Sequence, residues 1–143
     1  MNVLAKKQKM TQIWKGDTIV PVSPLKLIDA KNAEEFQEGD VVKVTGTTKG
    51  RGFQGVVKRY SFAGGPKTHG QKNRYRSPGS IGATAPQRVI PGVKMAGHMG
   101  VAKQSIRNLR VVTVDKDGGM IMVRGSVPGV VGGKLKIFKN SDL

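Results

Sequence analysis

The chain has 143 residues, with 25 Lys and Arg against nine Asp and Glu, a formal net charge of +16 and no cysteine. This length predicts a single domain with its own core, and the lack of cysteine excludes a disulfide framework, a thiolate zinc site and a thiol nucleophile. No apolar run approaches the roughly 18 residues of a membrane span, and the basic N-terminus lacks the apolar stretch of a signal peptide, so a cytoplasmic protein is expected.

Short β-prone runs occupy both ends of the chain. The predicted strands are Thr18–Val22, Leu25–Ile28, Val41–Thr45, Gly55–Tyr60, Leu109–Val114, Met120–Arg124 and Lys134–Phe138. Pro21 and Pro24 favour sheet edges or breaks, Ala30–Phe36 fits one or two helical turns, and Asp115–Gly119 is a good hairpin loop. Short strands separated by Gly-rich turns predict a mainly β fold, a small closed β-barrel with a long irregular basic extension.

The middle of the chain has a different character. From Ser61 to Ser105 no periodicity survives, and Gly and Pro recur too often for a helix or a strand. A loop of this length is either disordered or functional. We therefore expect residues 1–60 and 106–143 to form the barrel body and residues 61–105 to form an extended loop inserted in it.

Acidic residues are absent from Val41 to Val114, a stretch that carries fourteen Lys or Arg and both histidines. A solvated surface normally interleaves both signs of charge. Removing every acid from half of a chain leaves a positive field whose natural partner is a polyanion, most simply nucleic acid. The basic residues of the middle are spaced rather than clustered, which suits an extended chain that touches phosphates along a path.

The segment Thr47–Gly55 is rich in glycine and contains Lys49 and Arg51. Glycines let backbone N–H groups approach an anion closely. No Gly-Lys-Ser/Thr sequence closes the segment and no helical pattern follows it, so it matches neither a P-loop nor a dinucleotide fingerprint. It is either an RNA contact or a turn between barrel strands.

The aromatic and histidine side chains of the middle are candidates for RNA contacts. His69 and His98 lie almost thirty residues apart with no carboxylate or thiol near them, which argues against a metal site. Each either contacts a base or a phosphate or is an ordinary solvated residue. Tyr75, between two arginines, is the best candidate for base stacking, whereas Tyr60 and Phe62 are as easily explained by packing after a strand.

Catalysis is not expected. The basic stretch contains no carboxylate for general acid–base chemistry, and its serines have no base and orienting acid nearby in the sequence. The sequence predicts a binding protein with no cofactor, no metal and no small-molecule substrate.

Several motifs in one order resemble the large-subunit ribosomal protein L-three family. They are Lys6–Trp14 (KKQKMTQIW), Val44–Arg59 (VTGTTKGRGFQGVVKR), Thr68–Gly70, Ser77–Gly82, Met95–Gly100 and Val127–Gly129. Family members usually carry a sizeable extra segment between the first strands and the Val44–Arg59 motif. Only about Asp29–Glu38 occupies that place here, so the chain resembles a shortened member.

The resemblance implies a structural protein of the large ribosomal subunit that acts early in subunit assembly. Its partners would be large-subunit rRNA and neighbouring ribosomal proteins, and its extension would run through rRNA towards the peptidyl transferase centre. The residues expected to bind RNA are Lys6, Lys7, Lys49, Gly50, Arg51, Gly52, Lys58, Arg59, Lys67, His69, Lys72, Arg74, Tyr75, Arg76, Arg88, Lys94, His98, Lys103 and Arg107.

Two other classes of protein compete with this interpretation. A free RNA chaperone or a barrel-type translation factor would also be basic, but a factor would need a catalytic or GTP-binding domain for which the chain has no room. An enzyme on a small barrel, such as a flavin-type reductase, is disfavoured by the absent acids and the absent phosphate-binding motif.

Overall fold

The computed structural model describes residues 2–139 and divides the chain into two compact units. The first unit runs to Lys49 and resumes at Val101, and the second is Gly50–Gly100. We refer to them as the body and the insert.

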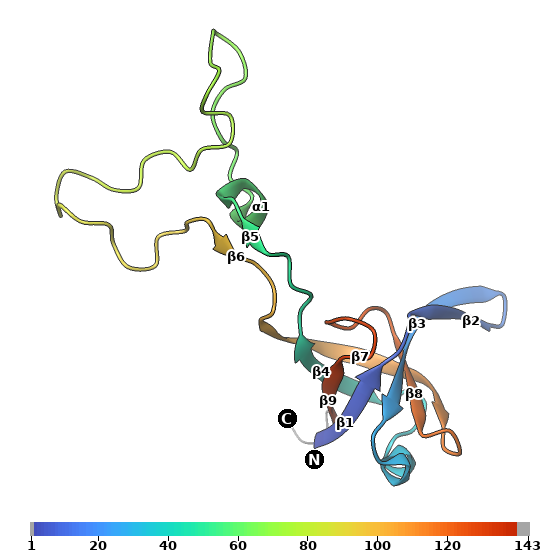
Figure 1. Cartoon of the computed structure of the whole chain (residues 1–143). Helices are drawn as coiled ribbons and strands as arrows, with labels where there is room; N and C mark the ends of the chain where they lie inside the picture. The colour runs from blue at the N-terminus through green and yellow to red at the C-terminus, as the bar shows by residue number, and fades with distance from the viewer. Residues whose placement is uncertain (1, 140–143) are drawn as a thin grey trace. The chain divides into compact units, whose positions relative to one another are not determined.

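The body is a closed barrel of six antiparallel strands (Figure 1). Its strands are β1 (Asn2–Lys7), β3 (Thr18–Leu27), β4 (Val41–Thr47), β7 (Lys103–Asp115), β8 (Met120–Arg124) and β9 (Lys134–Lys139). Their order is β1-β9-β4-β7-β8-β3, and β3 pairs back onto β1, which leaves the ring without a free edge. The short strand β2 (Thr11–Lys15) stands outside the ring as a hairpin with the first half of β3. The expected barrel is therefore confirmed.

The barrel is filled by residues that alternate along each strand. In β9, Leu135 and Ile137 are buried while Lys134 and Lys136 are exposed, as expected for a strand with one face on the core. The core contains Val3, Ala5, Leu25, Leu27, Ala33, Phe36, Val42, Val44, Val111, Ile121, Val123, Val127, Leu135 and Ile137. All of them belong to the body, so the body has the only sizeable core in the described part of the chain.

Ile137 provides a test of this core. Its side chain is 0% exposed and lies on β9 between Val3 of β1 and Val44 of β4. We expect Ile137→Ala to lower the free energy of unfolding by about 2–5 kcal/mol, through lost burial and the cavity left behind. Urea denaturation measures this effect. Val131→Ala, at a side chain that is 60% exposed, is the control and should change stability by less than about 0.5 kcal/mol.

The strands of the body are irregular in places. Strand β3 continues through Pro21 and Pro24, where a sheet edge or a break was expected, and both proline carbonyls accept backbone hydrogen bonds, from Gly125 and Gln8. Strands β4 and β7 lose register where Val42 pairs with Leu109 and Val44 with Ile106. Two residues of β7 therefore face one of β4, and Asn108 takes a positive φ there, as the bulged residue of a β-bulge often does.

Other expectations for the body hold. A 3-10 helix, η1 (Ala30–Glu35), lies where one or two helical turns were predicted, and the turn after Asp115 joins β7 to β8 as a hairpin.

Asp40, just before β4, forms an ion pair of 2.7 Å with Lys139 at the end of β9. Partial burial disfavours the charged carboxylate, but hydrogen bonds from Lys139 and the Gln37 amide outweigh it and lower the pKa of Asp40.

The insert contains little regular structure. A two-stranded ribbon pairs β5 (Phe53–Gln54) with β6 (Gly97–His98), and α1 (Val56–Tyr60) is a single helical turn. Residues 61–96 form neither helix nor strand, which agrees with the irregular middle that the sequence predicted. The predicted irregular stretch is too long at its C-terminal end, however, because β6 and the start of β7 at Lys103 lie within it.

The strand predicted over Gly55–Tyr60 is wrong. The Arg59 amide donates to the Gly55 carbonyl at 2.9 Å, and Ser61 closes the turn in the left-handed conformation with φ of 59°. Valines have low helix propensity, but here Val56 is the one buried apolar side chain of the insert. Burial of one face of a single turn outweighs local preference, since no neighbouring strand pairs with this segment.

The division between the units also differs from the boundaries expected at residues 61 and 105. Residues 50–60 belong with the insert because they pair with its far end. The Arg51 amide donates to the Met99 carbonyl at 2.8 Å, and the Met99 amide donates to Gly52 at 3.0 Å. Hydrogen bonds between residues almost fifty positions apart leave no local pattern in the sequence.

Candidate nucleic-acid interface

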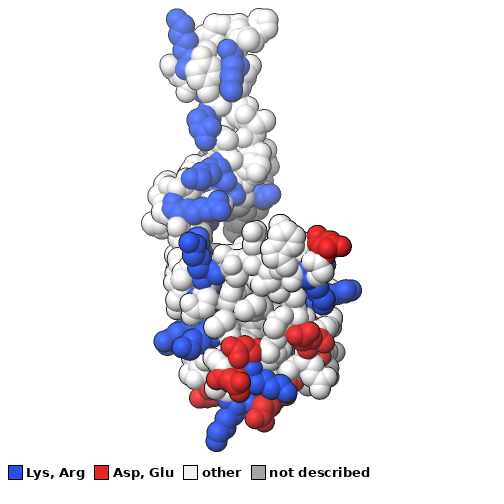
Figure 2. Space-filling view, turned by 90° about the vertical axis from the view of Figure 1, so that its right-hand side faces the viewer, with Lys and Arg blue, Asp and Glu red and all other residues white. Residues whose placement is uncertain are grey.

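The two units carry charge differently. The insert has nine Lys or Arg and no acid, whereas the body has the remaining sixteen basic residues and all nine acids of the chain. Figure 2 shows red side chains interleaved with blue ones on the body and only blue ones among the charged side chains of the insert. The body has the mixed charge of a solvated surface, and the insert has the charge of a surface that binds a polyanion.

The side chains of the insert are almost entirely accessible. Val56 is its one buried apolar residue, and the predicted contact residues of the insert are exposed except Arg59, which is half-buried. The exposed basic residues and histidines are Arg51, Lys58, Lys67, His69, Lys72, Arg74, Arg76, Arg88, Lys94 and His98. Such a unit presents its cations to a partner instead of using them in internal ion pairs.

The Gly-rich segment leads from the body into the insert. Lys49 is exposed at the end of the body, and Gly50, Arg51 and Gly52 are exposed at the start of the insert. Gly52 has φ of +68°, and a Cβ at this position would meet no atom within 4 Å. Glycine is therefore required by the backbone conformation and not by crowding. The open space beside Gly52 allows a bulky anionic group to approach the main chain.

Arg59 and Lys94 surround the ring of Tyr60. The Arg59 guanidinium carbon lies 5.0 Å and the Lys94 ammonium 5.6 Å from the ring centroid, within the range of a cation–π interaction. Arg59 also donates to the Met95 carbonyl at 2.7 Å and lies against Gly97, where a Cβ would be 2.6 Å from its terminal nitrogen. These contacts hold α1 against the segment before β6, so Arg59 has a structural role.

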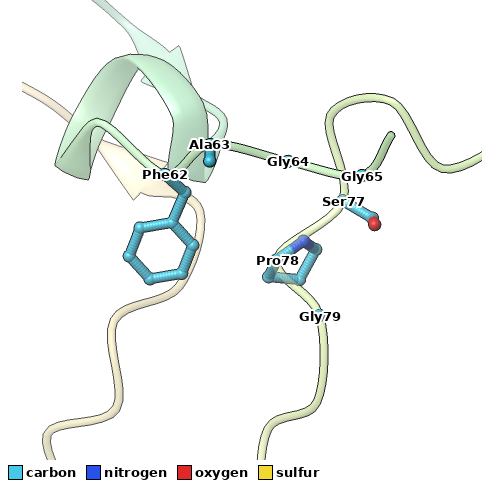
Figure 3. Close-up of a pocket in the computed structure, with 7 residues that line it drawn as sticks. All are labelled: Phe62, Ala63, Gly64, Gly65, Ser77, Pro78 and Gly79. Carbon is cyan, nitrogen blue, oxygen red and sulfur yellow. The ribbon is translucent and has the colours of Figure 1, made fainter. Parts of the chain in front are cut away.

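A small loop follows α1. The Gly65 amide donates to the Arg74 carbonyl at 3.1 Å, and a Cβ at Gly64 would lie 2.0 Å from the Tyr75 carbonyl oxygen. The Tyr75 hydroxyl donates to the Gln71 carbonyl. The loop encloses an open hollow of about 380 Å³, and Figure 3 shows Phe62 and Ala63 on one side of it and Ser77–Gly79 on the other. Tyr75, the predicted stacking residue, is 38% exposed and is tied to Gln71 within the loop by its hydroxyl.

The candidate residues of the body are Lys6, Lys7, Lys49, Lys103 and Arg107, and all except Lys7 are exposed. Lys7 turns inward. Its ammonium group donates to the Val127 carbonyl at 2.7 Å and to the Gly129 carbonyl at 2.9 Å. Burial and the neighbouring Lys49 charge lower the pKa of Lys7. The side chain ties β1 to the turn at Val127–Gly129.

This arrangement predicts different effects for two adjacent lysines. Lys7→Met keeps the aliphatic stem but leaves two carbonyls without their charged donor, and we expect a loss of about 1–3 kcal/mol in the free energy of unfolding. Lys6→Met, at an exposed position on the same strand, should leave stability unchanged and is the matched control. Urea denaturation of both variants compares the two. Equal stability of both variants would contradict a structural role for Lys7.

The two histidines lie in different surroundings. His69 is exposed with φ of 58° in an irregular loop, and His98 lies on β6 opposite Phe53 of β5. The Phe53 and His98 rings are 5.9 Å apart at 84°. Among residues 2–139, no group of three or more His, Cys, Asp or Glu could hold a metal ion, and no helix is long and apolar enough to cross a membrane.

Phe53 is the residue that sequence reasoning missed. The sequence indicated Tyr60, Phe62 and Tyr75 as candidate aromatic contacts. Phe53 is more exposed than any of these three, at 66%. Its position two residues after Arg51 in the Gly-rich segment was the available signal. Only the pairing of β5 with β6 shows that its ring lies next to His98.

Comparison with known proteins identifies close relatives. The family model described as ribosomal protein L3 matches residues 23–126. Large ribosomal subunit protein uL3 of Herpetosiphon aurantiacus is 50% identical over 112 residues, which cover 78% of this chain and 53% of that protein. The uL3 protein of Stenotrophomonas maltophilia is 53% identical over 102 residues, covering 71% of this chain and 47% of that protein. The chain thus spans about half the length of the curated relatives that it matches.

Proposed function

The chain belongs to the ribosomal protein L3 family, and from this premise we propose that it is a structural constituent of the large ribosomal subunit. It binds large-subunit rRNA and is not an enzyme. Neighbouring ribosomal proteins are its other partners, and the ribosome in the cytoplasm is its site of action.

One observation carries the proposal. The insert of residues 50–100 has nine cations, no acid and a single buried apolar side chain. Fixing the backbone of each residue costs about 1–2 kcal/mol, and one buried valine cannot offset this cost over the whole of residues 50–100. An RNA partner supplies both the countercharge and the contacts that hold such a segment in one conformation.

We assign different tasks to the two units. The body anchors the protein through exposed cations such as Lys6, Lys103 and Arg107. The insert follows the rRNA backbone with Arg51, Lys58, Lys67, His69, Lys72, Arg74, Arg76, Arg88, Lys94 and His98, and reaches towards the peptidyl transferase centre. Because the insert gains its order from RNA, binding belongs to an early stage of subunit assembly, before the rRNA around it has closed.

Salt dependence tests this function. If half of the fourteen basic residues between Val41 and Val114 contact phosphates, counterion release gives a slope of log K against log salt of roughly −5 to −6. Filter binding to a large-subunit rRNA transcript between 50 and 300 mM salt measures it. A slope shallower than about −2 would show that most of these charges do not contact RNA.

A further inference from the structure

We propose that Phe53 is a stacking platform for one unpaired nucleobase of the bound RNA. This assignment rests on the proposed function, and it names the chemical group that the ribbon of β5 and β6 takes. A nucleobase lies on the open face of the Phe53 ring, and the adjoining phosphate lies near Arg51.

The chain has seven aromatic residues, and five of them are less exposed than the other two. Phe36 is buried in the barrel, Phe62 and Phe138 are partly buried, Tyr60 has two cations over its ring, and Tyr75 is 38% exposed with its hydroxyl bonded to the Gln71 carbonyl. The remaining two are Trp14, 70% exposed, and Phe53, 66% exposed. Trp14 stands on the β2–β3 hairpin of the body near Asp17, whereas Phe53 stands in the insert, which has no acid.

The ribbon holds the Phe53 ring in a defined position. Phe53 pairs with His98 across the two strands, and hydrogen bonds between Arg51, Gly52 and Met99 extend the pairing by one step. The interplanar angle of 84° means that the His98 imidazole meets the Phe53 ring edge to face and covers at most one face. The other face is free, and a side chain already positioned loses little entropy when a base stacks on it.

The surroundings of the ring suit a nucleotide. Arg51 is exposed two residues before Phe53, and Gly52 between them has no side chain and no neighbour within 4 Å of its Cβ position. A sugar-phosphate therefore has room beside the main chain. Aromatic platforms next to cations are the usual means of holding unpaired bases, because every base has a stacking face and every phosphate a negative charge.

A protein partner fits this surface less well. One exposed ring offers a small fraction of the area that a specific protein interface buries, and the surrounding charges are all positive. Packing within the chain does not require the ring either, because two thirds of its surface is already in solvent.

Substitutions in the full chain separate stacking from simple hydrophobic contact. Phe53→Leu keeps an apolar side chain but removes the aromatic face, and we expect it to weaken binding to a large-subunit rRNA transcript by roughly 5- to 100-fold. The salt slope should stay unchanged, because no cation is lost. Phe53→Tyr keeps the ring and should bind within about threefold of the original chain. Trp14→Leu, the matched exposed aromatic of the body, should bind at full strength.

Crosslinking locates the contact. With the transcript carrying 4-thiouridine, irradiation followed by mass spectrometry of the digested protein should give a uridine adduct on the peptide that contains Phe53. Full-strength binding of Phe53→Leu, with adducts only on other peptides, overturns the stacking assignment and leaves the proposed function intact. If the chain without any substitution does not bind the transcript, both the stacking assignment and the proposed function are wrong. If Phe53→Leu weakens binding but also lowers the melting temperature of the free protein, the ring is structural and the assignment is wrong.

Discussion

Replacing residues 50–100 with a short Gly-Ser linker should leave a folded barrel that has lost most of its affinity for rRNA. The body keeps its entire core in this variant, because every core residue lies before Lys49 or after Val101. The Thr48 amide donates to Ala102 at 2.9 Å and the Val101 amide donates to Thr48 at 3.2 Å. The two ends of the barrel are thus already adjacent, and a short turn can join β4 to β7.

We expect β-type circular dichroism and a cooperative urea transition from this variant. Its affinity for the rRNA transcript should fall by about a hundredfold or more at 100 mM salt, since nine cations are removed. Residual binding should persist through Lys49 and the other exposed cations of the body. Loss of all β signal would show that the insert is part of the folding unit. Undiminished affinity would show that the insert does not contact RNA.

Neutralising three cations of the insert tests whether the insert contacts RNA without removing any of its backbone. Lys67, Lys72 and Arg76 are exposed, and none of them takes part in an ion pair within residues 2–139. If each contacts a phosphate, their combined replacement by Gln should make the salt slope shallower by about 2–3 and weaken binding by roughly 10- to 100-fold. The melting temperature should not change, because no buried group is lost.

The matched control removes the same charge from the body. Lys15, Lys31 and Lys116 are also exposed, but acidic residues lie close to them in the sequence, at Asp17, Glu34, Asp115 and Asp117. Their combined replacement by Gln should leave affinity within about threefold. Equal losses in the two triple variants would mean that binding follows net charge and has no preferred surface. A smaller loss in the insert variant would place the RNA contact on the body.

The barrel could be predicted from the sequence because its strands are local patterns. Lys134–Phe138 alternates basic and apolar residues after two glycines, Met120–Arg124 is an apolar run between Gly119 and Gly125, and both form strands there, the first extended to Lys139. The strand Gly55–Tyr60 was mispredicted since valines favour strands, while the burial of Val56 in a single helical turn depends on contacts made only in the folded chain.

The candidate site was only partly predictable for the same reason. Charge segregation identified the basic segment directly, because it is a property of composition. The inward orientation of Lys7 depends on Val127 and Gly129, which lie over a hundred residues away. The exposed Phe53 ring depends on pairing with His98, forty-five residues away. Neither contact has a local signature.

Sedimentation of the tagged chain tests the central claim most directly. Lysate from cells that express it is separated on a sucrose gradient at low and at high magnesium, so that whole ribosomes and separate subunits are both resolved. We expect the chain with the large subunit at low magnesium and with whole ribosomes at high magnesium, and the variant without residues 50–100 at the top of the gradient in both. Finding the chain that retains residues 50–100 at the top of the gradient, or with the small subunit, would contradict a structural role in the large subunit.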